Sequence, residues 1–462
     1  MIPLTLGRIV EITSGALAGT ADPHATVTGP VVIDSREAAP GTLFAAIKGA
    51  RVDGHDFAEQ AYRVGAAAVL ASRPLECEGA EAIPTVIVGD VVRALADLAT
   101  AVARELPRTT VLGVTGSAGK TSTKDLIARL TRRMGDTVSP PGSFNNEIGH
   151  PLTVLRAEAG TRFLVLELSA RETGHIAHLT RIAPPSVGIV LNVGTAHLGI
   201  FGGKEAIAQA KGELVEALPA TGTAILNADD PLVRAMADRT RARVLLFGRA
   251  VDAAIRAEQV TIDDRARASF TLATPSGSAQ VRLRLYGPHA VGNALAAAAA
   301  AYELGMPLAT IAEVLSEAEP ESRWRMEVRE RPDGVVVVND AYNANPDSMR
   351  AAFEALEALS AGRRRFAVVA ALSELGDHGP ELNEGVGRLA VRHGLAGLVV
   401  VGANAEPVLR GARGIPAIHV PDVESAVAEL APRLREGDAV LVKGPRAMGL
   451  ERVAEALTGG DR

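Results

Sequence analysis

The sequence is poor in cysteine and in aromatic residues. Among its 462 residues there is one cysteine, Cys77, and aromatic residues make up 3%. A single cysteine excludes an intrachain disulfide and indicates a reducing compartment. The chain also lacks a run of about 20 strongly apolar residues, and its first residues include charges where a signal peptide requires an apolar core. We therefore expect a cytoplasmic protein without a membrane span.

An excess of positive charge is missing too. Lys and Arg number 48 against 54 Asp and Glu, which gives a formal net charge of -6. This balance argues against a nucleic acid or an anionic membrane surface as a partner. Any phosphate would have to be bound by local lysines, arginines and backbone amides. Hydrophobic residues make up 47% of the chain, and at about 100–200 residues per domain its length predicts three domains.

The first predicted domain comprises residues 1–106. Short apolar strands are expected in VVIDSR and GTLFAAIKG, where polar residues or glycines bound each run. Apolar residues at helical spacing predict a helix from about Val91 to Arg104, which ends before Pro107.

The second and third predicted domains comprise residues 107–319 and 320–462. Apolar runs alternate with helical patterns in both, and such runs are typical of parallel strands covered on both faces. We therefore predict an α/β fold with three α/β domains in series. Two segments of the second domain, ASFTLAT and AQVRLRLYG, instead predict an antiparallel hairpin. The strand candidates are VLGVTG, RFLVLELS, VGIVLN, TAILNA and ARVLLFG in the second domain, and GVVVVNDAY, FAVVAAL, LAGLVVVG, AIHVP and DAVLVKG in the third.

A glycine-containing loop follows the first strand of the second domain and opens a predicted helix. Its pattern, GxxGKT, is shorter than the usual GxxxxGK[ST], because Val114 occupies the first glycine position. In this context backbone amides and the helix N-terminus favour an anion, Lys120 would reach the terminal phosphates of a nucleotide, and Thr121 would bind Mg²⁺. The alternative is a glycine turn beside a surface lysine. The predicted ATP-binding residues of this loop are Gly116, Ser117, Ala118, Gly119, Lys120, Thr121 and Ser122.

Polar residues at the ends of the following strands are further candidates, because ligands gather at the carboxyl ends of parallel strands. Glu167 ends the run FLVLEL and could hold Mg²⁺, or it could cap a helix or form a salt bridge. His197 follows the next strand and could bind a metal or a phosphate, although loop histidines are commonly solvated. Lys211 falls within a predicted helix, where an ordinary surface lysine is expected.

Two more clusters follow predicted strands. The cluster of Asp340, Tyr342, Asn343 and Asn345 offers a carboxylate for a ribose and an aromatic ring for a purine, or it forms a turn and a helix cap. In the first domain, Ser35 and Arg36 could bind a phosphate, and a turn with a cap explains them equally well.

Taken together, these stretches resemble the Mur ligases over nearly the whole chain. The motif TGSAGKT is similar to that family's phosphate loop, and NVGTAHLGIFGGKEAIAQAKGEL is similar to its histidine and lysine segment. The segment DSREAAPGTLFAAIKGARVDGHDF resembles the uridine-nucleotide domain of the two late-acting members. The segments NDAYNANPDSM, ALSELGDHG and LVKGPRAMGLERV resemble the last-acting member in particular. The resemblance implies an N-terminal uridine-nucleotide domain, a central P-loop ATPase-like domain with a parallel sheet, and a C-terminal Rossmann-like domain.

The resemblance also implies roles for single residues. Lys120 and Thr121 would hold the ATP phosphates and Mg²⁺, and Lys211 would be carbamylated and so become an anionic metal ligand. The remaining implied roles are Glu167 and His197 at a second Mg²⁺, Asn293, Asp340, Tyr342 and Asn343 at adenosine, Arg325 at the phosphates, Asn145 and Asn146 at the peptidyl substrate, and Ser35 and Arg36 at the uridine diphosphate. The implied catalytic residues are Lys120, His197, Lys211 and Arg325.

The implied reaction belongs to peptidoglycan precursor synthesis. A monomeric, cytoplasmic enzyme would activate the carboxylate of UDP-N-acetylmuramoyl-tripeptide as an acyl phosphate at the expense of ATP, and D-alanyl-D-alanine would then displace phosphate. Two alternatives remain open: a relative that adds a different amino acid, and a P-loop regulatory ATPase.

Overall fold

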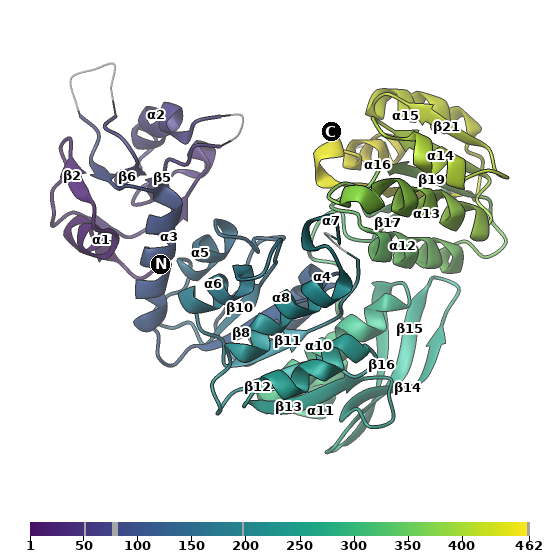
Figure 1. The fold of residues 1–462 in the computed structure, drawn as a ribbon, viewed down its shortest axis with the longest axis horizontal. Coiled ribbons are helices and arrows are strands. Elements are labelled where there is room, and N and C mark those ends of the chain that lie inside the picture. Colours follow the sequence, from purple (N-terminus) through teal and green to yellow (C-terminus); the bar gives the residue numbers. More distant parts are fainter. Residues whose placement is uncertain (50–51, 76–81, 196–197, 460–462) are drawn as a thin grey trace. The chain divides into compact units, whose positions relative to one another are not determined.

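The computed structural model describes residues 1–49, 52–75, 82–195 and 198–459. The chain forms two compact units, whose elements are labelled in Figure 1. The first unit consists of Met1–Gly113, Thr131–Ser169 and Ile176–Val187, and the second of Val114–Leu130, Ala170–His175 and Gly188–Arg462. Among the described residues, every helix is too short or too polar to cross a lipid bilayer.

The first unit contains a five-stranded sheet with the order β2-β7-β6-β5-β4. Strands β4 to β7 are parallel, whereas β2 is antiparallel to β7. The sheet's apolar core includes Phe44 and Val69. The strands of this unit are β1 (Leu4–Thr5), β2 (Ala16–Ala18), β3 (Thr26–Val27), β4 (Val31–Val32), β5 (Leu43–Ala45), β6 (Ala68–Ala71), β7 (Thr85–Ile87), β9 (Thr137–Val138) and β10 (Phe163–Glu167).

Helix α3 (Val91–Arg104) confirms the helix predicted for this part of the chain. The Asp90 side chain caps it by accepting a hydrogen bond from the Arg93 amide at 3.0 Å. Its buried residues recur every three or four positions, which places them on one face. The other helices are α1 (Leu6–Thr13), η1 (Ser35–Glu37), η2 (Gly54–Phe57), α2 (Ala58–Arg63), α5 (Gly149–Val154) and α6 (His175–Ile182), of which α6 begins in the second unit.

In the second unit, one sheet has the strand order β16-β15-β14-β13-β12-β11-β8. Strands β12, β13 and β14 pair in parallel, and β14, β15 and β16 pair antiparallel, so the predicted hairpin is confirmed. The strands are β8 (Thr110–Thr115), β11 (Val187–Val190), β12 (Thr223–Asn227), β13 (Arg243–Gly248), β14 (Ile255–Ile262), β15 (Arg267–Thr274) and β16 (Gly277–Tyr286). Strands β8 and β11 begin in the first unit.

The alanine-rich helix α10 (His289–Glu303) is buried along most of its length. Small side chains let neighbouring elements approach it closely, as a helix inside an α/β domain requires. The other helices of this part are α4 (Lys120–Arg132), α7 (Leu198–Phe201), α8 (Lys204–Glu216), α9 (Pro231–Arg234), η3 (Ala235–Arg239) and α11 (Leu308–Ser316).

The second unit also contains a six-stranded sheet with the order β17-β18-β22-β19-β20-β21. Successive residues of β18 point to opposite faces: Val336 and Val338 belong to the core under α12 to α14, and Val337 to the core under α15 and α16. This doubly wound arrangement confirms the α/β pattern predicted for residues 320–462.

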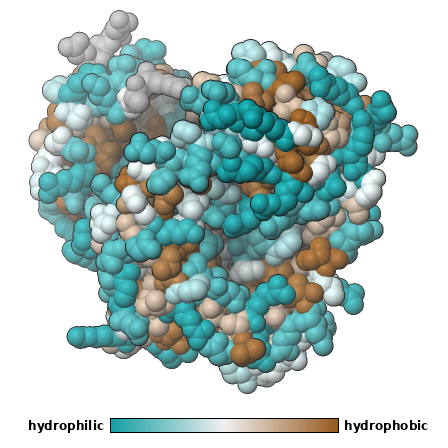
Figure 2. Space-filling view, turned by 45° about the vertical axis from the view of Figure 1, so that its right-hand side comes forward, coloured by the Kyte–Doolittle hydropathy of each residue, from teal (hydrophilic) through white to brown (hydrophobic). Residues whose placement is uncertain are grey.

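The strands of this sheet are β17 (Glu327–Glu330), β18 (Val336–Asn339), β19 (Arg365–Ala370), β20 (Gly397–Val401), β21 (Ala417–Val420) and β22 (Ala439–Lys443). Its helices are α12 (Pro346–Leu359), η4 (Gly376–His378), α13 (Gly379–Arg392), α14 (Glu406–Gly411), α15 (Val423–Leu430), η5 (Ala431–Arg433), η6 (Arg446–Met448) and α16 (Glu451–Leu457). The face drawn in Figure 2 is mostly hydrophilic, with apolar residues in separate patches.

Candidate active site

The predicted phosphate loop lies between β8 and α4, as the strand–loop–helix pattern requires. Gly119 has φ +82°, a left-handed conformation that favours glycine, and a Cβ there would lie 2.4 Å from Asn293 Oδ1. Asn293 of α10 therefore packs directly against the loop. Lys120 Nζ donates to the Gly116 carbonyl at 2.8 Å, so the lysine folds back over the loop.

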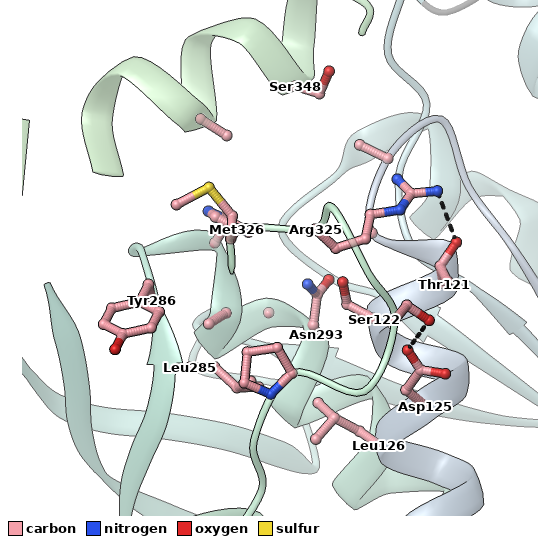
Figure 3. A pocket seen from close by; sticks show the side chains of 18 of the residues that line it. Thr121, Ser122, Asp125, Leu126, Leu285, Tyr286, Asn293, Arg325, Met326 and Ser348 are labelled. Carbon is pink, nitrogen blue, oxygen red and sulfur yellow. Dashed lines mark hydrogen bonds between the residues drawn. The ribbon is translucent and has the colours of Figure 1, made fainter. Parts of the chain in front are cut away.

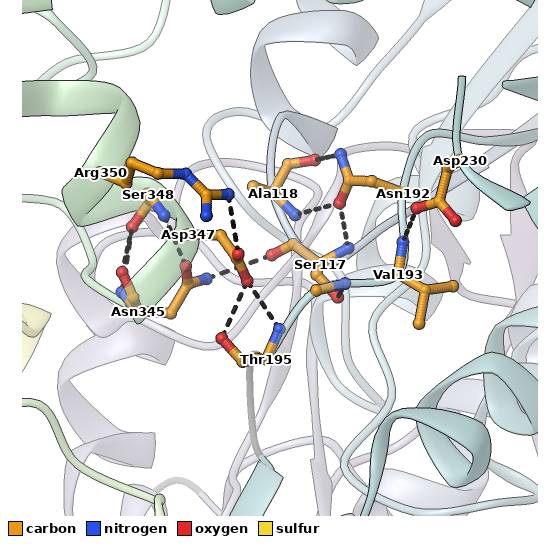
Figure 4. Close-up of polar contacts among 11 residues, drawn as sticks. Ser117, Ala118, Asn192, Val193, Thr195, Asp230, Asn345, Asp347, Ser348 and Arg350 are labelled. Carbon is orange, nitrogen blue, oxygen red and sulfur yellow. Dashed lines mark hydrogen bonds and ion pairs between the residues drawn. The ribbon is translucent and has the colours of Figure 1, made fainter. Parts of the chain in front are cut away.

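Asn192, which directly follows the apolar run of β11, holds this loop in place. Its Oδ1 accepts hydrogen bonds from the amides of Ser117 and Ala118, both at 2.9 Å, and its Nδ2 donates to the Ala118 carbonyl at 3.1 Å (Figure 4). Both amides therefore donate to one side-chain oxygen of Asn192, which fixes the backbone of the loop.

A cavity of about 220 Å³ opens beside the loop (Figure 3). One part of the cavity wall is apolar and is formed by Leu126, Leu285 and Met326. The part of the wall next to the phosphate loop is polar. An apolar wall with a few convergent polar groups suits a nucleotide base joined to phosphates. Seven predicted ATP-binding residues line the cavity: Ala118, Gly119, Thr121, Ser122, Asn293, Arg325 and Asp340. The other five predicted ATP-binding residues are not among the described residues that line the cavity: Gly116, Ser117, Lys120, Tyr342 and Asn343.

Arg325 contacts both the phosphate loop and Tyr342. Its Nη2 donates to Thr121 Oγ1 at 3.1 Å, and its guanidinium carbon lies 4.2 Å from the centroid of the Tyr342 ring. The residues on either side, Trp324 and Met326, have φ of +59° and +50°, which is uncommon for residues with a side chain. Strained backbone of this kind clusters at active sites and ligand-binding sites, where side chains are held in fixed orientations.

Asp340 forms a buried ion pair with Lys443 at the end of β22. Lys443 Nζ donates to Asp340 Oδ2 at 2.5 Å and to the Asn343 carbonyl at 2.9 Å, while Asp340 Oδ1 accepts from the Met326 amide at 3.1 Å. Burial lowers the pKa of Lys443, and the Asp340 carboxylate opposes that shift. His289 lines the same cavity, and burial lowers its pKa as well.

Lys211 lies in α8, as predicted, but it is not a surface lysine. Only 6% of the residue is exposed, so the interpretation as an ordinary solvated lysine is wrong. Burial lowers its pKa well below the ordinary value, and the positive charge of Lys120 lowers it further. Both effects disfavour the charged ammonium form of Lys211.

In the first unit, Glu167 and Asn145 lie together. Glu167 is 1% exposed, and its Oε1 accepts from Asn145 Nδ2 at 2.6 Å and from Ser143 Oγ at 3.3 Å. Asn146 Oδ1 accepts from the Gly149 amide at 2.9 Å, at the start of α5. Within the described residues no group of three His, Cys, Asp or Glu side chains could hold a metal ion, and His197 lies outside them.

Ser35 and Arg36 lie in η1, which the Asp34 side chain caps. Ser35 is 8% exposed and its Oγ donates to Gln60 Oε1 at 3.1 Å. Arg36 is exposed and forms a bidentate contact with Asp34, which lowers the pKa of that carboxyl to about 2. The turn and the cap are thus present, and the exposed guanidinium remains accessible to a ligand.

Three family models match successive parts of the chain. They are the Mur ligase family catalytic domain over residues 30–111, the Mur ligase middle domain over residues 114–301, and the Mur ligase glutamate ligase domain over residues 324–446. The chain belongs to the Mur ligase family. Its α/β fold has the three-domain architecture that the resemblance implied.

Similar Mur ligases share one name. The UDP-N-acetylmuramoyl-tripeptide–D-alanyl-D-alanine ligase of Mycobacterium tuberculosis (strain ATCC 25618 / H37Rv) is 47% identical over 506 residues, which cover 100% of this chain and 99% of that protein. The ligase of the same name in Escherichia coli (strain K12) is 35% identical over 464 residues, which cover 99% of each protein.

Solved structures agree with this likeness. The crystal structure of MurF from Acinetobacter baumannii has a TM-score of 0.87 and 30% identity, and the match covers 99% of each chain. MurF ligase from Thermotoga maritima, solved in complex with ADP, has a TM-score of 0.79 and 32% identity over 94% of this chain and 98% of that chain.

Sequence reasoning did not assign a role to several residues at the site of this Mur ligase. They are Asn192, His289, Asp347 and Lys443. Asn192 follows the apolar run of β11 and Lys443 ends the apolar run of β22, and both are polar residues at carboxyl ends of parallel strands. The rule that identified Glu167 could have found these two, whereas His289 and Asp347 lie in helices whose packing the sequence does not reveal.

Proposed function

We propose that this chain is an ATP-dependent ligase that joins D-alanyl-D-alanine to UDP-N-acetylmuramoyl-tripeptide in peptidoglycan precursor synthesis. The observation that carries the proposal is the phosphate loop, which borders a cavity of about 220 Å³ and is contacted there by Arg325. The relatives that match this chain along its whole length carry the name of that reaction. MurF ligase from Thermotoga maritima, which matches 94% of this chain, was solved with ADP.

The proposed chemistry has two steps. The terminal carboxylate of the tripeptide attacks the γ-phosphate of ATP, which forms an acyl phosphate and releases ADP. The amine of D-alanyl-D-alanine then attacks the acyl carbon, and inorganic phosphate leaves. Two anions must meet in the first step, so positive charge is required. Lys120 on the phosphate loop and Arg325 at Thr121 would supply it from the protein.

Mg²⁺ would supply the remaining positive charge when bound, and we propose two ions. The available groups suit this hard cation: the Thr121 hydroxyl, the buried carboxylate of Glu167, and Lys211 if it is carbamylated. His197 is proposed as a further ligand.

We propose the remaining site roles and the domain limits on the same basis. Residues 1–106 would bind the uridine diphosphate through Ser35 and Arg36, residues 107–319 would bind ATP, and residues 320–462 would complete the site. Asn145 and Asn146 would contact the peptidyl substrate, and Asn293, Asp340, Tyr342 and Asn343 the adenosine. The enzyme would act as a monomer in the cytoplasm, where ATP is supplied. Sedimentation at the enzyme's working concentration would test the oligomeric state.

A phosphate-release assay tests the function. The enzyme is given ATP, Mg²⁺ and UDP-N-acetylmuramoyl-tripeptide with a panel of amino acids and dipeptides. We expect release only when D-alanyl-D-alanine is also present. Preference for another acceptor would favour a different ligase of the family, and release without an acceptor would favour a regulatory ATPase.

The same assay tests the phosphate loop. Lys120→Ala should abolish ADP release, whereas Lys204→Ala, a change of an exposed lysine at the start of α8, should leave it near the wild-type rate. Near-normal turnover by Lys120→Ala would refute the assignment of the loop.

A further inference from the structure

Asp347, in the first turn of α12, contacts the loop that follows β11. Its Oδ2 accepts hydrogen bonds from the Thr195 amide at 2.6 Å and from Thr195 Oγ1 at 3.0 Å (Figure 4). A Cβ at Gly194 would lie only 2.1 Å from the same oxygen. Glycine at this position is therefore what allows the carboxylate to approach the loop.

The same loop is bound to the phosphate loop. The Gly194 amide donates to Ser117 Oγ at 2.8 Å, and Asn345 Nδ2 donates to the Ser117 carbonyl at 3.2 Å. Asn345 is fixed by a capping box with Ser348 at the start of α12. Ser117 is thus contacted both by the loop after β11 and by the residue that caps α12, and Asp347 connects these two elements directly.

A carboxylate near a phosphate loop would repel the phosphates of a nucleotide unless its charge were compensated. Three features compensate it here. Arg350 donates to Asp347 Oδ1 at 3.1 Å, Thr195 supplies two hydrogen bonds, and the N-terminus of α12 favours negative charge. The Asp347 side chain is 22% exposed, so these contacts are only partly screened by water.

We propose that Asp347 is a positioning residue, which holds residues 193–195 against the phosphate loop so that the carboxylate substrate and the γ-phosphate meet in the correct geometry. This inference rests on the proposed ligase activity. Asp347 acts through Thr195 and Ser117, while the cavity that would bind the base and ribose is lined by other side chains. Its loss should therefore affect the rate of the reaction more than the binding of nucleotide.

The first test compares Asp347→Ala, Asp347→Asn and a matched control. Asp333→Ala is the control, because Asp333 also pairs with an arginine, Arg331, but its other side-chain contact is the Val335 amide rather than the loop after β11. We expect kcat to fall roughly 10- to 100-fold in Asp347→Ala, as for loss of hydrogen bonds to a charged group. The KM for ATP and the Kd for ADP should change less than about threefold. Asp347→Asn keeps one acceptor oxygen, so its kcat should lie between those of wild type and Asp347→Ala. The kcat of the control should match that of wild type.

The second test measures amide hydrogen exchange of the segment that contains Thr195, and it needs no catalytic activity. In the wild type the Thr195 amide donates a hydrogen bond to Asp347 and should be protected from exchange. Asp347→Ala should accelerate exchange there, and Asp333→Ala should not.

The two tests separate the outcomes. Unchanged exchange together with a kcat within about twofold of wild type would overturn the positioning role. A fall in ADP affinity that matches the fall in kcat, in the isosteric Asp347→Asn as well, would also overturn it, because Asp347 would then belong to the nucleotide-binding site. Faster exchange in Asp347→Ala, in an enzyme that lacks ligase activity even as wild type, would support the contact and refute the proposed function.

Discussion

The Arg325 guanidinium donates a hydrogen bond to the Thr121 hydroxyl over 3.1 Å, and so joins residues that are 204 positions apart in the sequence. A second contact of the same kind links Ser322 Oγ to Asp125 Oδ2 at 2.6 Å. The segment that leads into β17 is therefore bonded to the phosphate loop and to the first turns of α4. A nucleotide in the cavity would meet side chains from both segments, so its binding and the position of Arg325 should depend on each other.

The first prediction concerns Arg325. Arg325→Ala should lower kcat/KM for ATP by roughly 100-fold, because the cation that we propose to lie at the phosphates is lost. Arg325→Lys should recover little, since a lysine cannot both donate to Thr121 and stack its charge on the Tyr342 ring as the guanidinium does. Steady-state kinetics with varied ATP would measure this.

Arg323 provides the control for that experiment. It lies two residues away, is 73% exposed and stacks on Trp324. Arg323→Ala should stay within about threefold of wild type, as a change at an exposed site usually does. Equal losses in the two variants would mean that the segment as a whole, rather than the Arg325 guanidinium, matters.

The second prediction concerns Lys211. Lys211→Ala should be nearly inactive, and short-chain carboxylic acids such as acetate should partly restore it by placing a carboxylate in the vacated space. The physical reason is that burial and the charge of Lys120 lower the pKa of Lys211, which favours the neutral amine, the form that reacts with CO₂. Lys204→Ala, on the exposed start of the same helix, should need no rescue. A mass spectrum showing unmodified Lys211 in the active, fully liganded enzyme would exclude the carbamate.

The sequence predicted the elements of this site better than their contacts. Apolar periodicity and Pro107 located α3 correctly, and alternation identified the hairpin of β15 and β16, because both signals lie within one short segment. The same holds for the phosphate loop, whose short GxxGKT pattern lies between a predicted strand and a predicted helix.

The sequence did not predict which polar residues would pair when they lie far apart along the chain. Asp340 was predicted from its place after a strand, yet its ion pair with Lys443 spans 103 positions. Lys211 was expected at a helix surface, because the pattern of α8 does not reveal that both sides of the helix are covered at that point. Such pairings depend on the tertiary fold and leave no local signal.

The third prediction concerns the ion pair of Asp340 and Lys443. Lys443→Met should lower the free energy of unfolding by roughly 3–5 kcal/mol, because it leaves the Asp340 carboxylate buried without its cation. The double variant Asp340→Asn with Lys443→Met should be less destabilised than the single variant, since no uncompensated charge remains. Urea unfolding would measure both. Asp333→Ala removes a partly exposed ion pair with Arg331 and should change stability by less than about 1 kcal/mol.

The fourth prediction concerns His150, a buried histidine in α5. Burial is the main cause that lowers its pKa, to about 3, and the nearby charge of His178 adds to the shift. The folded protein therefore excludes a proton that the unfolded chain binds below pH 6.5. The contribution of this residue to stability is complete above pH 6.5 and is lost as the pH falls from 6.5 towards 3.

His150→Val should therefore remove part of the acid sensitivity of the protein. Between pH 7.5 and pH 5, the wild type should lose about 2 kcal/mol more unfolding free energy than the variant, as the shifted pKa requires. Urea unfolding at the two pH values would measure the difference. His24→Val, at an exposed histidine, is the matched control and should follow the wild type. If His150→Val and the wild type lost equal stability between the two pH values, His150 would have to accept its proton in the folded protein, and α5 would have to open to water at pH 5.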